Sequence, residues 1–175
     1  MKLGLKRGIV KLNYFNPVWI KEYKKEEKFL KMVLGDNIVS IEHFGSTSIE
    51  GMPSKPIIDI LVGVKSVKNE GRVCLNILKK FPKYFQREKY FSPKNRLLIA
   101  KGNDKNRTHY IHIVRYNGRV WKDRLFFRDY LRKDKIKFDQ YQRLKEVLSE
   151  NNLNDRKKYT LAKNKFVKEI IKKQK

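Results

Sequence analysis

The 175-residue chain has a single cysteine, Cys74, and no long apolar run. A lone cysteine cannot form an internal disulfide, and its apolar neighbours are typical of a core position. The apolar runs are far shorter than the roughly 20 residues that a helix needs to span a bilayer. The basic N-terminus lacks the apolar stretch of a secretory signal. We therefore expect a cytoplasmic protein that does not enter a membrane.

Acidic residues are also scarce, with 18 Asp and Glu against 43 Lys and Arg, for a net charge of +25. The excess is uneven, because residues 1–64 carry +3, residues 65–119 carry +12 and residues 120–175 carry +10. Such a field attracts polyanions and makes their binding depend on salt. Nucleic acid is thus one candidate partner. A compositional preference for lysine, which supplies 31 of the 43 basic residues, is the other explanation.

Two apolar runs within residues 38–64 bracket a short loop of small residues. The first run, residues 38–44, alternates like a half-buried strand. The second, residues 56–64, is almost continuously apolar, as in a strand covered on both faces. Asp59 interrupts the second run. A carboxylate inside a buried strand is costly unless a metal, a cation or several donors satisfy it.

The loop itself, Gly45-Ser46-Thr47-Ser48, has the composition of a phosphate-binding turn. Gly45 permits a sharp turn, and the three hydroxyls offer donors and acceptors. Backbone amides in such a turn can cradle a phosphate. An ordinary connection between strands has a similar composition, so the loop alone leaves both interpretations open.

Periodicity and breakers predict an α/β or α+β domain over residues 1–175, with a small mixed sheet and a helical C-terminal layer. In strand 107–114, alternation places Tyr110 and His112 on one face and His109 on the other. A turn is expected at residues 92–95. The predicted strands are 10–14, 38–44, 56–64, 84–86, 96–100 and 107–114, and the predicted helices are 16–34, 66–81, 121–133, 135–149 and one capped by Asn154 or Asp155.

The string His-Phe-Gly-Ser-Thr-Ser-Ile-Glu-Gly-Met-Pro-Ser-Lys-Pro-Ile-Ile-Asp-Ile-Leu-Val, residues 43–62, resembles the signature of the nucleotidyltransferase superfamily, which has a polymerase-beta-like fold. Its wording is closer still to one branch, the GrpB family. The opening Leu-Asn-Tyr-Phe-Asn-Pro-Val-Trp and the tail Tyr-Thr-Leu-Ala-Lys-Asn-Lys-Phe also resemble that family, so the likeness runs over residues 10–171. A similar domain is fused to some dephospho-CoA kinases, which implies a nucleotide or nucleotide-derived ligand by analogy.

The resemblance implies that Gly45 and Ser46 hold a phosphate and that Asp59 is the first metal carboxylate. A working transferase also needs a second carboxylate two residues on, where this chain has Leu61. The predicted strand 107–114 and the residues up to 119 contain no Asp or Glu, so the chain offers too few carboxylate ligands for two Mg²⁺ ions. A single Mn²⁺ or Zn²⁺ ion could instead use Asp59 with His112 and His43.

Several other side chains could act in such a site. His112 could be a general base, a phosphate donor or a metal ligand, or a structural histidine. Lys55 could pair with a phosphate or with Asp59, or lie in solvent. Thr47 and Ser48 complete the phosphate turn. Arg107, Arg128 and Arg132 are candidates for bidentate phosphate contacts, although Arg128 could equally form an ion pair with Asp129.

Three functions fit these patterns. The first is a nucleotidyltransferase with catalytic residues Asp59, His112 and Lys55, and Leu61 counts against it. The second is a non-catalytic module that binds a nucleotide or a nucleotide-derived molecule through the same turn. The third is an RNA-binding or RNA-modifying protein, suggested by the excess of positive charge in residues 65–175.

Overall fold

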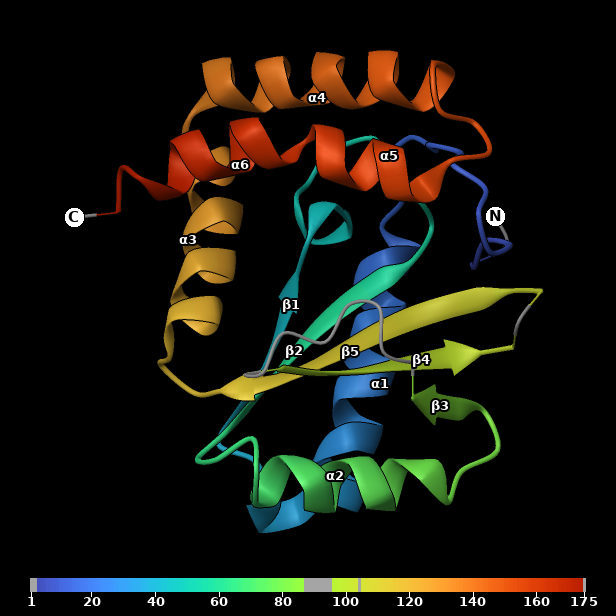
Figure 1. Ribbon diagram of the computed structural model, residues 1–175, viewed down its shortest axis with the longest axis vertical. Helices are drawn as coiled ribbons and strands as arrows, with labels where there is room; N and C mark the ends of the chain where they lie inside the picture. Colours follow the sequence, from blue (N-terminus) through green and yellow to red (C-terminus); the bar gives the residue numbers. More distant parts are fainter. Residues whose placement is uncertain (1–2, 87–95, 104, 175) are drawn as a thin grey trace.

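The computed structural model describes residues 3–86, 96–103 and 105–174, and a five-stranded mixed sheet lies at its centre (Figure 1). The strand order is β1-β2-β5-β4-β3. β2 and β5 run parallel, and all other neighbours run antiparallel. The strands are β1 Ser40–Phe44, β2 Ile58–Val64, β3 Tyr84–Gln86, β4 Arg96–Gly102 and β5 Arg107–Arg115. The predicted α/β class with a small mixed sheet is confirmed.

Helices cover both faces of this sheet (Figure 1). α1 and α2 enclose the main apolar core on one face, and α3 packs on the opposite face against β1 and β5. α4 and α6 extend this second layer and pack, with α3, on the loop between β1 and β2. This is the predicted helical C-terminal layer. The helices are α1 Val18–Leu34, α2 Glu70–Lys79, α3 Arg119–Lys133, α4 Lys135–Glu150, α5 Arg156–Ala162 and α6 Asn164–Ile171, with short 3₁₀ turns η1 Gly35–Asn37 and η2 Ser46–Ser48.

α1 begins where the sequence predicts. The Asn16 side chain accepts a hydrogen bond from the backbone N–H of Val18 at 2.9 Å, and Pro17 has no N–H that needs a partner. The apolar residues of α1 that recur at helical spacing are buried against the sheet, and they hold α1 on β1 and β2. This stripe consists of Trp19, Tyr23, Leu30 and Leu34.

A buried carboxylate ties α1 to the far edge of the sheet. Glu26 of α1 accepts a hydrogen bond from the Tyr84 hydroxyl of β3 at 2.5 Å and forms an ion pair with Lys101 of β4. The Glu26 side chain is 3% exposed. Lys101 also lies over the ring of Tyr84. These three side chains therefore satisfy one another in a place where an unpaired charge is costly.

Two predicted elements were wrong. Residues 10–14 form no strand, and one isolated bridge, Asn13 with Ser54, ties this segment to the fold. The single helix predicted at the C-terminal end is two helices. Asp155 caps α5 as predicted, but α5 ends at Ala162, and α6 begins after Lys163. The predicted strands 84–86 and 96–100 are present. The turn expected at residues 92–95 lies outside the described residues.

Candidate functional site

The loop between β1 and β2 brings its glycine into contact with Asp59. Gly45 has φ +72° and ψ −178°, a conformation that is essentially restricted to glycine. A Cβ atom at Gly45 would lie 2.7 Å from Oδ2 of Asp59. The glycine is therefore required both by the backbone and by the carboxylate that lies against it.

Two of the three predicted phosphate-binding hydroxyls instead hold the loop in shape. Ser48 donates a hydrogen bond from Oγ to the carbonyl oxygen of Gly45 at 2.6 Å. Oγ1 of Thr47 lies 3.0 Å from Nε2 of His43. Both hydroxyl side chains are buried. Ser46 is half-buried, so it is the most accessible of the three hydroxyls and the best placed to meet a ligand. It also interacts with the hydroxyl of Tyr141 from α4.

The parallel register of β2 and β5 places Asp59 and His112 on the same face of the sheet. Oδ1 of Asp59 is 3.7 Å from Nε2 of His112, and 32% of the Asp59 side chain is exposed. Burial alone would raise the pKa of Asp59, but contact with His112 and the charges of Lys55 and Arg156 outweigh it and lower this pKa. Burial lowers the pKa of His112, which leaves a neutral imidazole beside a carboxylate.

His43 does not join this pair, and the expected three-ligand metal set is not brought together. The register pairs Phe44 with Asp59, so those two share a face and His43 lies on the other. There its ring stacks on Tyr23 at 4.6 Å. No cluster of three or more His, Cys, Asp or Glu side chains suited to a metal ion occurs within the part of the chain that the structure describes.

Burial lowers the pKa of His43 to about 3 and that of His109 to about 4. Between pH 6.5 and 4 the unfolded chain therefore binds protons that the folded chain does not, and stability falls as the pH falls. Each histidine contributes a loss of about 1.4 kcal/mol per pH unit over that range. We expect the free energy of unfolding, followed by thermal unfolding at several pH values, to fall with this slope as the pH is lowered. His43→Phe should reduce the slope by the contribution of one histidine. An unchanged slope in that variant would contradict a buried neutral His43.

A two-metal site does not fit the residues around Asp59. Leu61, at the position of the second carboxylate, is fully buried among Phe44, Val114 and Trp121. That apolar cluster holds α3 against the sheet. Asp59 is thus the one acidic side chain that this strand face offers.

Basic side chains gather around Asp59 instead. Lys55, just before β2, lies over the ring of Tyr159 at 4.7 Å, and Lys163 lies over the same ring at 4.1 Å. Arg156 of α5 lies over the ring of Tyr110 at 5.2 Å. Burial, together with the charges of Lys163 and Arg156, lowers the pKa of Lys55 well below its usual value. Burial lowers the pKa of Lys163 to about 8 although Asp59 raises it.

Two more arginines lie near His112. Arg124 of α3 and Arg96 of β4 both lower the pKa of His112. Arg96 pairs in register with Val114, so its side chain shares the face of His112 and Asp59. The sequence patterns did not point to Arg96, Arg124, Arg156 or Lys163 as site residues. Three of them lie on separate elements, β4, α3 and α5, and Lys163 lies between α5 and α6, where the interruption of the helix is the one local feature that could have pointed to it.

The predicted phosphate-binding arginines have structural partners. Arg128 of α3 donates to Glu42 and to the carbonyl oxygen of His43, both at 2.8 Å, and pairs with Asp129 at 2.8 Å. Arg132 donates to the carbonyl oxygen of Ser48 at 2.7 Å. Both arginines thus brace β1 and the loop from outside the site.

Arg107 is not brought to the loop either. Its side chain is buried at the start of β5, and its guanidinium lies over the ring of Phe85 at 5.4 Å. Phe85 belongs to β3, at the edge of the sheet opposite β1. Arg107 therefore extends away from the Gly45 turn.

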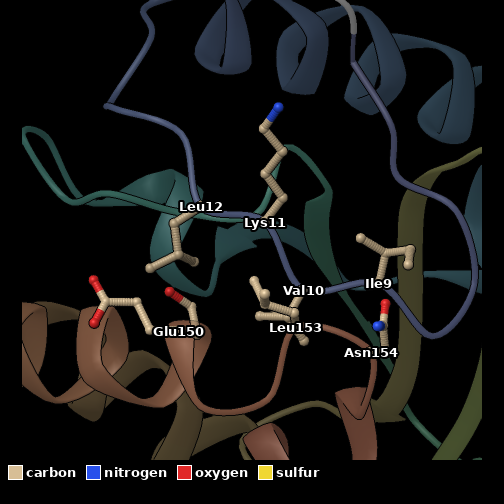
Figure 2. A pocket seen from close by; sticks show the side chains of 8 residues that line it. Ile9, Val10, Lys11, Leu12, Glu150, Leu153 and Asn154 are labelled. Atoms are coloured by element: carbon tan, nitrogen blue, oxygen red, sulfur yellow. The ribbon is translucent and has the colours of Figure 1, made fainter.

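Two hollows lie away from Asp59. In one, of about 360 Å³, Val10 and Leu12 face Leu153 and Glu150 while Lys11 points away (Figure 2). It lies where the N-terminal segment crosses the connection from α4 to α5. The other, of about 720 Å³, is lined by residues of α1, of the loop after Ser48 and of α3 and α4.

The fold and site define an α/β protein in which one strand carboxylate, held against a glycine turn, is surrounded by basic side chains. The chain belongs to the GrpB family, described as "GrpB protein", which matches residues 9–173. It is 36% identical to the "Glutamate-rich protein GrpB" of Alkalihalophilus pseudofirmus, over 97% of this chain and 98% of that protein.

Other relatives agree with this assignment. The chain is 32% identical to the UPF0157 protein YqkA of Bacillus subtilis over 91% of its own length, but it spans only 45% of that protein. The crystal structure of conserved protein GrpB from Enterococcus faecalis superposes with a TM-score of 0.81 at 30% identity, covering 93% of this chain and 95% of that one. None of the helices that the structure describes has the length and apolar content of a membrane-spanning segment.

Proposed function

We propose that this protein binds a nucleotide, or a nucleotide-derived phosphate compound, at the Gly45 turn beside Asp59, on a fold of the nucleotidyltransferase type. The observation that carries the proposal is the position of Lys55, Arg156 and Lys163. Lys55 and Lys163 lie over the same ring of Tyr159, at 4.7 and 4.1 Å, and the charges of Arg156 and Asp59 act on both of them. Positive charges held this close together repel one another unless an anion binds between them.

The turn and the helical layer complete the site. The Gly45 turn carries the half-buried Ser46, and α4 and α5 contribute the buried rings of Tyr141 and Tyr159. Apolar rings beside a few convergent polar groups are typical of small-molecule sites. A phosphate would meet the basic groups that these rings hold in place.

Nucleotidyl transfer is the catalytic form of the same proposal. Asp59 beside the glycine turn is the arrangement that this chemistry uses, and the neutral His112 could accept a proton from an attacking hydroxyl. Leu61 and the neighbouring cations favour binding over metal-dependent transfer. We therefore place nucleotide binding first.

Differential scanning fluorimetry with nucleoside mono-, di- and triphosphates tests the proposal. A ligand that binds only the folded state stabilises it by roughly 2.7 kcal/mol at a hundred times its dissociation constant. We expect a saturable shift with wild type that Arg156→Gln removes. Lys158→Gln, which makes the same charge change at an exposed position of α5, should keep it. Release of pyrophosphate in the same samples would establish the catalytic form.

Nucleic acid is the competing ligand class. A short RNA that stabilises wild type and Arg156→Gln equally, while mononucleotides stabilise neither, would place the binding on the general basic surface and overturn the proposal. Steep dependence on salt would accompany that result.

A further inference from the structure

We infer that Lys55, Arg156 and Lys163 replace the divalent metal ions of a conventional nucleotide site, so that this protein takes its phosphate ligand free of metal. The inference rests on the proposed function and adds to it the charge state of the ligand. It concerns what neutralises the phosphates once they reach the Gly45 turn.

The first support is the balance of charge at the site. The acidic group that acts on both Lys55 and Lys163 within the described residues is Asp59, while Arg156 acts on both of them with the same sign. A divalent cation placed beside Asp59 would add two positive charges to this cluster. A phosphate dianion or a pyrophosphate would instead offset charges that are already present.

The second support is how the basic groups are held. Ring faces rather than carboxylates lie against them: Tyr159 contacts Lys55 and Lys163, and Tyr110 contacts Arg156. A ring face attracts a cation without accepting its hydrogen bonds in the way that a carboxylate does. The donors are thus positioned before a ligand arrives.

The third support is a donor that has no acceptor. Nη1 of Arg156 is buried and makes no hydrogen bond to any group that the structure describes. Buried guanidinium nitrogens normally have partners, so such an atom points to an acceptor that is bound from outside. A phosphate oxygen between Arg156 and Lys163 would supply it.

The remaining polar groups do not compete for that phosphate. Lys145 of α4, although close to Lys55, donates to the carbonyl oxygen of Pro53 and so holds the loop before β2. Asp59 lies against Gly45 and His112. In a metal-free site this carboxylate repels the phosphates and orients the lysines, whereas in a metal site it would be the principal ligand.

Isothermal titration of the full chain with inorganic pyrophosphate and with a nucleoside triphosphate, in EDTA and again in Mg²⁺, distinguishes the two. We expect binding in EDTA that Mg²⁺ leaves unchanged or weakens, because the metal competes for the phosphates. Binding that appears only with Mg²⁺ or Mn²⁺ would overturn this inference and leave the proposed function standing. No binding under either condition would remove both.

The sign of the Asp59→Asn effect gives a second readout. We expect this isosteric change to raise the affinity for pyrophosphate in EDTA, about threefold to tenfold, because it removes the negative charge of Asp59 beside the ligand. A loss of affinity greater than tenfold would instead assign Asp59 the role of a metal ligand. Circular dichroism of the variant controls for folding.

Lys163→Gln should lower the affinity at least tenfold, and Lys163→Arg should retain most of it. Lys165→Gln is the matched control, since Lys165 is exposed on α6 and carries the same charge. Equal losses in Lys163→Gln and Lys165→Gln would mean that overall charge, and not this cluster, attracts the anion.

Discussion

Gly45→Ala is expected to abolish nucleotide binding and to lower the free energy of unfolding by about 3 kcal/mol or more. Two costs combine in this variant. An alanine pays about 1–3 kcal/mol for the glycine-only backbone conformation. Its Cβ would also lie 2.7 Å from Oδ2 of Asp59, which forces either the turn or the carboxylate to move. Urea unfolding and fluorimetry with nucleotide measure the two effects.

Gly35→Ala is the matched control for this experiment. Gly35 also has a positive φ, +51°, at the end of α1, but a Cβ there meets no atom within 4 Å. It therefore measures backbone strain without the contact. If Gly35→Ala destabilises the protein as much as Gly45→Ala does, and nucleotide binding survives in both, the contact between Gly45 and Asp59 has no functional meaning.

Glu26→Ala is expected to destabilise the protein by about 3 kcal/mol. The change leaves the Lys101 ammonium partly buried without its carboxylate and the Tyr84 hydroxyl without its acceptor. Removing one member of a buried ion pair typically costs about 3–5 kcal/mol, and we take the lower end because the Lys101 side chain is 24% exposed. Chemical denaturation measures the loss.

Glu22→Ala on the same helix serves as its control. Glu22 pairs with Lys25 at 2.7 Å, but the Lys25 side chain is 74% exposed. A surface pair of this kind contributes at most about 1 kcal/mol. Equal losses in Glu22→Ala and Glu26→Ala would show that the buried network contributes nothing beyond a surface pair.

The elements next to the site could be predicted because their signals are local. Alternation in residues 38–44, the apolar run of β2 and the glycine between them depend on neighbours in the chain, so the strand–turn–strand unit and Asp59 followed from them. Alternation also placed Tyr110 and His112 on one face of their own strand, but only the parallel register of β2 and β5 showed that this is the face of Asp59.

The place of His43 could not be predicted in this way. His43 and Asp59 lie on different strands, and the register between those strands depends on how the intervening loop folds. A shift by one residue would have put His43 beside Asp59. Arg107 and Arg128 illustrate the same limit, because their partners, Phe85 and Glu42, are distant in sequence.

By itself, the sequence determined the mixed α/β class and the pairing of a glycine turn with one strand carboxylate, since these depend on order and periodicity along the chain, and its resemblance in residues 43–62 pointed to the family. The tertiary structure decided what surrounds that carboxylate. Packing of α5 and α6 over the sheet brings Arg156 and Lys163 to Lys55 and Asp59, across about a hundred residues of chain. Basic side chains repel one another, so no interaction between near neighbours in the chain would collect them in one place. Only the packing of distant elements does so.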